Sequence, residues 1–242
     1  MAKKSRPFLT ARWLDLLMIN YEVDPVLLRP LVPAGTQLDT WRGRTRMSVV
    51  AFHFRDTRVR GLPIPLHRHF EELNLRFYVR RESGGELRRG VVFIKEVVPR
   101  WAIARIARQL YNENYAALPM HHDNWTAPPA ARHFSYQWLT GHRLNRLAAT
   151  ARGEPVTPAD DSEEAFITEH YWGYVRQRNG STLQYQVEHP RWRVWRADTL
   201  TVDTDWSALY DAPLCEALAA RPTSVLVAEG SEVTVRRGVR IS

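Results

Sequence analysis

Three things are scarce in this chain: cysteine, lysine and long apolar runs. The 242 residues contain one cysteine, Cys215, which excludes an internal disulfide and any metal site built from a cysteine cluster. No apolar run approaches the ~20 residues that span a bilayer, so we expect no membrane segment. The start of the chain is basic, but Asp15 interrupts the apolar stretch that follows and no small-residue cleavage site appears. We therefore expect no secretory signal and a cytoplasmic protein.

Lysine is nearly absent, because arginine supplies almost all of the positive charge. Lys3 and Lys4 lie in the N-terminal tail, and Lys95 is the only other lysine. Lys95 stands within the apolar run 91–98, which is typical of a buried or half-buried strand. Burial can lower the pKa of a lysine by up to ~3–5 units and so produce a nucleophilic amine. In the alternative interpretation, arginine has replaced lysine throughout and Lys95 is an ordinary strand residue paired with a carboxylate.

Length and composition indicate one folded domain over residues 1–242, with a flexible basic tail at residues 1–9. Hydrophobic residues make up 44% of the chain and aromatic residues 11%, which excludes a disordered protein. The net charge of +8 and the pI near 10.0 invite a nucleic-acid partner. The arginines are scattered among acidic residues, however, and no zinc-finger spacing or basic helix occurs. We expect no nucleic-acid partner.

Strand patterns dominate the chain and predict an α+β fold that is mainly antiparallel sheet with a few short helices. A capping Asp24 followed by Pro25 predicts one helical turn over 24–31. Apolar residues at helical spacing predict a longer helix over 100–111, and the polar stretch 153–164 indicates a loop. The predicted strands are 13–23, 37–41, 46–54, 70–80, 91–98, 132–139, 142–151, 170–176, 182–189, 191–202, 223–228 and 232–240. The strands 37–41 and 46–54 are expected to form one hairpin, and the strands 70–80 and 91–98 a second.

One predicted strand carries a row of polar side chains. Side chains alternate along a strand, so one face shares the residues Glu72, Asn74, Arg76 and Tyr78, and the other face is apolar. In the simplest interpretation this is a sheet with one face in water. In the functional interpretation the row lines a cavity, where acid, amide and guanidinium groups orient a carboxylate or carbonyl ligand.

The partner strand adds Lys95 and Glu96, which strict alternation places on opposite faces. Val91, Phe93 and Val97 would share the face of Lys95. If Lys95 joins the polar row, the nearby Arg76 would depress the pKa of its amine. If Glu96 joins it, the site holds two carboxylates around Arg76 and has no nucleophile. The sequence leaves this register open.

Other common sites are missing. The histidine pairs 67/69 and 121/122 do not follow a metal-ligand spacing, so we expect no metal. No Gly-x-Ser-x-Gly and no glycine-rich phosphate loop occurs, so we expect no serine hydrolase and no nucleotide or other cofactor.

Several segments together resemble a known family. Phe70–Val79, Gly90–Phe93 and a helix with Arg105 and Arg108 resemble the family called domain of unknown function 2071 (DUF2071). The segments 96–100, 110–115, 170–172 and 188–192 are similar to the same family. The resemblance covers roughly residues 10–240.

The resemblance implies a fold similar to acetoacetate decarboxylase, a single β-rich domain with a cone-like barrel around a cavity. It implies that Glu72, Asn74 and Arg76 line this cavity. The decarboxylase uses a Schiff-base lysine within a Gly-Phe-Pro-Lys-Lys motif. Here the corresponding segment 111–115 reads Tyr-Asn-Glu-Asn-Tyr and has no lysine. The catalytic residue of that enzyme therefore has no counterpart at this position.

Three hypotheses follow. In the first, the cavity binds a small anionic or carbonyl-bearing molecule: Arg76 orients the anion, Asn74 donates a hydrogen bond, and Glu72 or Glu113 is a polar or proton-handling group. Glu96 is a further candidate ligand-binding residue. In the second, Lys95 is the Schiff-base nucleophile of a decarboxylase or another lyase. In the third, the protein is a non-catalytic structural or interaction module. An edge-rich sheet can also pair into a homo-oligomer, although no residue pattern demands it.

Overall fold

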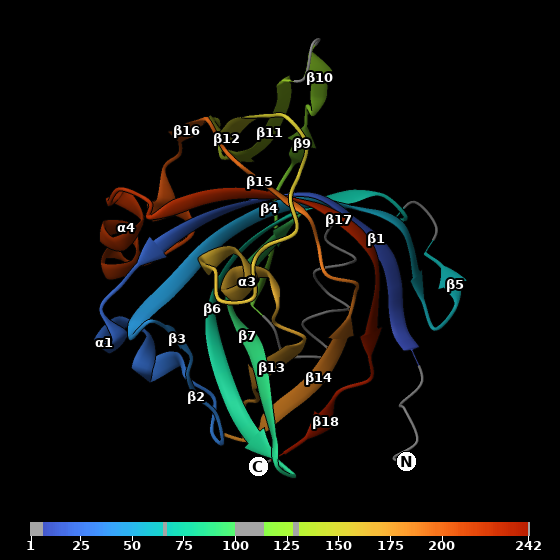
Figure 1. The fold of residues 1–242 in the computed structure, drawn as a ribbon, viewed down its shortest axis with the longest axis vertical. Helices are drawn as coiled ribbons and strands as arrows, with labels where there is room; N and C mark the ends of the chain where they lie inside the picture. Colours follow the sequence, from blue (N-terminus) through green and yellow to red (C-terminus); the bar gives the residue numbers. More distant parts are fainter. Residues whose placement is uncertain (1–6, 65–66, 100–113, 128–130, 242) are drawn as a thin grey trace.

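The computed structural model describes residues 7–64, 67–99, 114–127 and 131–241 (Figure 1). Seven strands close into a barrel, because β14 pairs with β13 on one side and with β17 on the other. Around the barrel the order is β1 (Pro7–Glu22), β4 (Arg44–Val59), β6 (Phe70–Ser83), β7 (Glu86–Val98), β13 (Trp172–Arg176), β14 (Thr182–Glu188) and β17 (Ser224–Arg236). Only the β7–β13 pairing within this ring is parallel. The expected β-rich fold, mainly antiparallel and closed into a barrel, is confirmed.

A second sheet lies outside the barrel (Figure 1). It consists of β9 (Met120–His122), β10 (Trp125–Ala127), β11 (Ala131–Thr140), β12 (Arg143–Arg152) and β16 (Thr199–Asp203). Short strands extend the barrel sheet: β2 (Gln37–Leu38), β3 (Thr40–Trp41), β5 (Leu62–Pro63), β8 (Tyr115–Ala117), β15 (Val194–Arg196) and β18 (Val239–Arg240). The described helices are α1 (Pro25–Leu28), η1 (Arg29–Leu31), α3 (Glu163–Thr168), η2 (Trp206–Ala208) and α4 (Ala212–Ala219). None of these helices has the length and apolar character needed to cross a membrane.

The local signals of the sequence explain the hairpins and the first helix. Arg42 and Gly43 both have positive φ between β3 and β4, and Gly84 and Gly85 do so between β6 and β7. A two-residue turn of this kind matches the twist of its flanking strands. The carboxylate of Asp24 accepts a hydrogen bond from the Val26 N–H at 2.8 Å and so caps α1. The second predicted hairpin and the helical turn are confirmed. The first hairpin is confirmed only for Thr40–Trp41, because Gln37–Leu38 pairs with β6 and not with β4.

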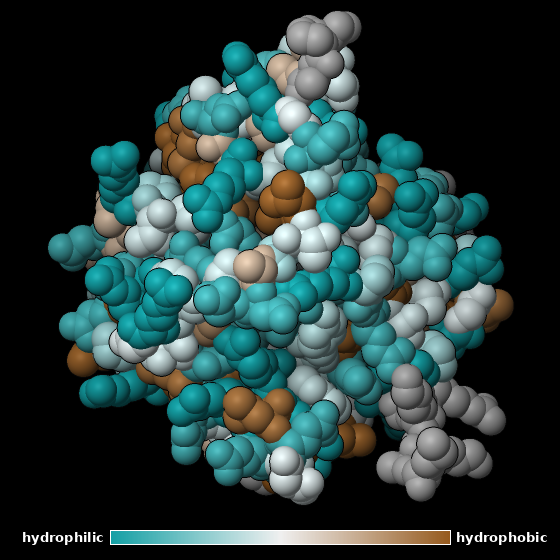
Figure 2. Space-filling model, viewed as in Figure 1, coloured by the Kyte–Doolittle hydropathy of each residue, from teal (hydrophilic) through white to brown (hydrophobic). Residues whose placement is uncertain are grey.

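The barrel wall separates two apolar cores. The outer core joins Leu73, Leu75 and their neighbours in the barrel wall to the second sheet and α4. The inner core lies on the opposite face and includes Phe54, Phe70 and Tyr78. In a closed barrel, alternate side chains point inward and outward. The polar row of β6 therefore belongs to the inside, and the simple interpretation of one wet face is wrong. Figure 2 shows that the visible surface is mainly hydrophilic, with small separate hydrophobic patches.

Some predicted boundaries are wrong. Residues 7–9 belong to β1 and not to a tail, and the predicted strand 191–202 is split into β15 and β16. The strand predicted over 223–228 and the first part of the one predicted over 232–240 form one strand, β17, and Val239–Arg240 form β18. Gly230 allows this continuity, because its φ is +79° and a Cβ there would lie 1.9 Å from the Trp13 carbonyl oxygen. The helix predicted over 100–111 lies outside the described residues.

Candidate functional site

A cavity of about 140 Å³ lies within the barrel. An engineered cavity of about 150 Å³ holds benzene, so this volume suits a small organic molecule. Its lining side chains come from the strands of the barrel wall, from β8 and from α3. The polar ones are Thr57, Glu72, Arg76, Glu96, Tyr115, Thr168, Tyr185, His170 and His189. The other lining residues are apolar or aromatic, so a few polar groups stand in a mainly apolar chamber, which is the usual composition of a ligand site.

A β-bulge decides which residue of β7 reaches the cavity. Leu75 lies opposite Lys95, but Arg76 lies opposite Phe93, so Ile94 is an extra residue on β7. An extra residue reverses the alternation of side chains beyond it. Phe93 and Glu96 both line the cavity as a result, although they are three residues apart. The expectation that Lys95 shares a face with Phe93 is wrong.

Lys95 lies outside this cavity. Its amine donates a hydrogen bond to the carbonyl oxygen of Leu209 and lies 5.7 Å from the centre of the Tyr210 ring. Both partners follow η2, on the outer side of the barrel wall. A Schiff base with a ligand in the cavity would require Lys95 to leave these contacts.

We expect no Schiff base on Lys95, because its amine already serves as a hydrogen-bond donor outside the cavity. The protein is incubated with a panel of β-keto acids and borohydride, and its intact mass is measured. The expected result is that the natural protein and Lys95→Arg show the same added masses, or none. The variant also controls for adducts on the tail lysines. A covalent adduct that disappears in Lys95→Arg would restore the Schiff-base hypothesis.

Arg76 is the one arginine among the described residues that line the cavity. Its residue is 8% exposed, and its Nη2 donates a hydrogen bond to the carbonyl oxygen of Ile167 at 3.3 Å. The guanidinium also lies 5.7 Å from the centre of the Tyr78 ring. Its Nε has no hydrogen-bond partner, and no carboxylate lies within ion-pair distance of Arg76 among the described residues. A buried cation without an anion is costly, so this arrangement favours an anionic ligand.

The two carboxylates of the lining are each held by a hydrogen bond. Asn74 Nδ2 donates to Glu72 Oε1 at 3.1 Å, and the Tyr115 hydroxyl donates to Glu96 Oε1 at 2.7 Å. Asn74 is buried but does not line the cavity. The expectation that Asn74 lines the cavity is therefore wrong, and in this structure its amide supports Glu72. Glu113 lies outside the described residues.

Two histidines of the lining were not singled out as site residues from the sequence. His170 is buried, its Nε2 lies 3.4 Å from Asp39 Oδ2, and burial lowers its pKa to about 4. Arg89 Nε in turn donates to Asp39 Oδ2 at 2.7 Å. His189 stacks on Trp192 with ring centres 3.9 Å apart, and burial lowers its pKa too. Both imidazoles therefore favour the neutral form. In the sequence, only the position of these histidines within segments 170–172 and 188–192, which resemble DUF2071, pointed to a role for them.

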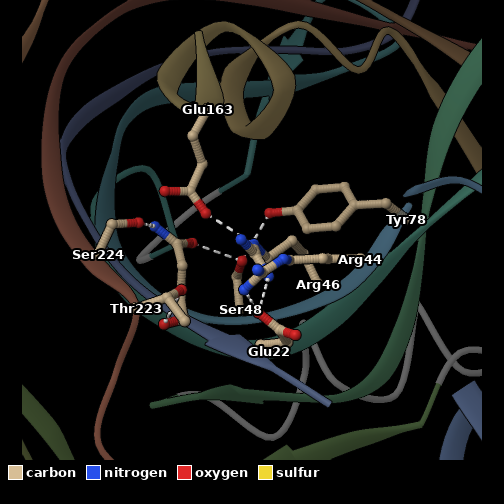
Figure 3. A network of polar contacts seen from close by, with 9 residues as sticks. Glu22, Arg44, Arg46, Ser48, Tyr78, Glu163, Thr223 and Ser224 are labelled. Carbon is tan, nitrogen blue, oxygen red and sulfur yellow. Dashed lines mark hydrogen bonds and ion pairs between the residues drawn. The ribbon is translucent and has the colours of Figure 1, made fainter. Parts of the chain in front are cut away.

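A buried hydrogen-bond network continues from the cavity wall toward one rim of the barrel (Figure 3). The Tyr78 hydroxyl lies 2.6 Å from the Ser48 hydroxyl, which also donates to Asn20 Oδ1 at 2.6 Å. Asn20 Nδ2 donates to the Ser224 hydroxyl at 3.0 Å. The ring of Tyr78 meanwhile lies 4.6 Å from that of His170. Neighbouring strands thus fix the position of Tyr78, the last member of the polar row.

Comparisons with known proteins agree with this architecture. The chain is 29% identical over 195 residues to the uncharacterized protein YqjF of Bacillus subtilis (strain 168), covering 79% of this chain and 77% of that protein. It is similar in fold to acetoacetate decarboxylase from Legionella pneumophila, with a TM-score of 0.67 and 13% identity over 98% of this chain and 88% of the other. The enduracididine biosynthesis enzyme MppR complexed with pyruvate gives a TM-score of 0.66 and 13% identity, over 100% and 92%.

At such low identity these structural likenesses establish the fold alone. The sequence comparison goes further, since residues 10–232 match the family described as "Uncharacterized conserved protein". The chain belongs to that family, DUF2071, and has an acetoacetate decarboxylase-like fold.

Proposed function

We propose that this protein binds a small organic carboxylate inside the barrel, with the carboxylate at Arg76. The observation that carries this proposal is the buried guanidinium of Arg76, which lines the cavity and has no carboxylate partner among the described residues. An ionic ligand would replace the water that this cation loses on folding. The fold neighbour MppR has been observed with pyruvate, which agrees with a carboxylate that also bears a carbonyl group.

The carboxyl groups of Glu72 and Glu96 would stand beside the bound ligand. They are the proton-handling groups of the proposal, since a carboxylic acid can donate to a ligand carbonyl and a carboxylate can accept a proton. His170 and His189 favour the neutral form, so they add hydrogen-bonding capacity without a second positive charge. Arg76 is then the cation that selects an anion.

Arg76→Gln should abolish most of the binding, because glutamine keeps a polar side chain and removes the charge. Charge-assisted hydrogen bonds contribute about 1.5–3 kcal/mol, so we expect affinity to fall roughly tenfold to a hundredfold. The measurement is the shift of the melting temperature, followed by calorimetric titration, with pyruvate and acetoacetate. Pyruvamide, which lacks the charge, serves as the ligand control.

Arg80→Gln is the matched protein control, since Arg80 lies on the same strand with its side chain exposed. It should bind like the natural protein. If Arg76→Gln stays folded and binds pyruvate and acetoacetate unchanged, the proposed role of Arg76 is wrong. If no small carboxylate stabilises the natural protein, the hypothesis of a non-catalytic module gains instead.

A further inference from the structure

The end of the cavity away from Arg76 is built from aromatic rings, which we call the aromatic end: Trp13, Phe54, Phe70 and Trp192. All four line the cavity. Phe54 and Phe70 stack with ring centres 4.4 Å apart, and the Trp13 ring lies 5.6 Å from Phe54. Trp192 lies 6.5 Å from Trp13. The faces and edges of these aromatic rings favour a ligand that contains a planar ring.

Two polar atoms of the cavity lining have no partner, one of them in the aromatic end. Trp13 Nε1 and Thr57 Oγ1 are buried and make no hydrogen bond with any described residue. Both residues line the cavity, and Thr57 is 1% exposed. Buried indole N–H and hydroxyl groups ordinarily find partners, because leaving them unsatisfied is unfavourable. A ligand oxygen that accepts from Trp13 and exchanges a hydrogen bond with Thr57 would satisfy both.

Phe70 and Arg76 lie far apart along β6, so a three-carbon acid held at Arg76 does not also contact the aromatic end. Phe70 and Arg76 lie on the same strand, six residues apart, which is about 20 Å of strand at 3.3 Å per residue. Both side chains nevertheless line one cavity. A carboxylate at Arg76 therefore leaves the aromatic end to another part of the ligand.

We propose that the ligand is an aryl carboxylate whose ring bears an oxygen substituent. This inference rests on the proposed function, because it takes the carboxylate to be at Arg76. The ring lies between the side chains of the aromatic end. A phenolic oxygen accepts a hydrogen bond from Trp13 Nε1 and donates one to Thr57 Oγ1.

A matched series of acids tests this assignment on the full-length protein: propionate, hexanoate, 3-phenylpropionate and 3-(4-hydroxyphenyl)propionate. Calorimetric titration measures each dissociation constant. We expect 3-phenylpropionate to bind at least tenfold more tightly than propionate and more tightly than hexanoate. The hydroxyl should add roughly a further fivefold to tenfold, as expected for a hydrogen bond to a buried donor.

Trp13→Phe isolates the hydrogen bond, because it keeps an aromatic ring and removes the indole N–H. We expect the ratio between the affinities for 3-(4-hydroxyphenyl)propionate and 3-phenylpropionate to fall to about one in this variant, and that ratio is compared with the one measured for the natural protein. Thr57→Val, which preserves the shape of the side chain, should remove part of the same gain. Melting temperatures measured without ligand establish that each variant is folded.

The outcomes separate the two proposals. If the acids bind and depend on Arg76, but hexanoate matches 3-phenylpropionate and the hydroxyl adds nothing, the aryl assignment is wrong and the proposed function stands. An unchanged hydroxyl gain in folded Trp13→Phe and Thr57→Val overturns the assigned contacts. If none of the four acids, pyruvate or acetoacetate binds, the proposed function itself fails.

Discussion

Replacing Arg46 with methionine should lower the free energy of unfolding by about 3–5 kcal/mol, the usual cost of breaking a buried ion pair by removing one partner. The Arg46 side chain is 4% exposed, and its Nε lies 2.6 Å from Glu163 Oε1. Its Nη1 lies 3.0 Å from Glu22 Oε2 (Figure 3). Arg46 thus connects α3, which carries Glu163, to β1 and β4 at the rim of the barrel. Urea unfolding monitored by tryptophan fluorescence measures the loss.

Arg44→Met is the matched control for this prediction. Arg44 lies on the same strand and its Nη1 contacts the same Glu22 Oε2 at 2.9 Å, but its side chain is 62% exposed. Exposed ion pairs contribute about 0–1 kcal/mol, so this variant should lose little stability. Similar losses in the two variants would show that burial of Arg46 is not the decisive factor.

The same ion pair has a consequence for the cavity. Helix α3 also carries Ile167 and Thr168, which line the cavity, and the Ile167 carbonyl accepts the hydrogen bond from Arg76. A loosened α3 would release that contact. Arg46→Met should therefore weaken binding of small carboxylates as well, in the fraction of protein that remains folded.

Acid should destabilise this protein strongly between pH 6.5 and pH 4. Burial lowers the pKa of both His53 and His170 to about 4, from a value of 6.5 for an exposed histidine. In this range the unfolded chain binds protons that the folded chain does not, so stability falls as the pH is lowered. Each histidine contributes about 3 kcal/mol over the whole range at about 1.4 kcal/mol per pKa unit. Unfolding free energies from urea titrations at several pH values measure the slope.

The two histidines have different surroundings, and the contribution of each to the pH dependence of stability can be measured separately. His53 stacks on His122 with ring centres 4.4 Å apart, whereas His170 lies beside the carboxylate of Asp39. His53→Gln and His170→Gln should each make the pH dependence shallower, whatever they do to stability at neutral pH. His142→Gln, at an exposed position, should leave the slope unchanged. A slope unaltered by either buried variant would contradict the prediction.

The sequence predicted the polar row correctly because it depends only on backbone geometry. Side chains of a strand alternate whatever the strand packs against, so Glu72 and Arg76 necessarily share a face. The hairpin turns were equally accessible, since Gly84 and Gly85 supply the positive φ values that the turn requires. Segment 191–202 was mistaken for one strand because its interruption comes from pairing with two different sheets.

The site itself was only partly predictable. The alternation expected along β7 is interrupted at Ile94, which is the extra residue of a β-bulge. No local sequence pattern of β7 predicts this bulge. His170 and His189 come from segments far from β6, and only the closure of the barrel brings them to Arg76. Their neutral state follows from burial, which is a property of the surrounding structure and not of the histidine sequence positions.

The sequence by itself determined most of the long strands, the hairpin turns, the family and the shared face of Glu72, Asn74, Arg76 and Tyr78. These follow from local backbone preferences and from residue identity. The sequence did not predict the short strands β5, β8, β9 and β10. Only the tertiary structure decided that this face is the inside of a closed barrel, that Glu96 reaches the cavity and that Lys95 does not. The physical reason is that burial and strand register depend on hydrogen bonds between segments distant in the chain, such as the pairing of β14 with β17.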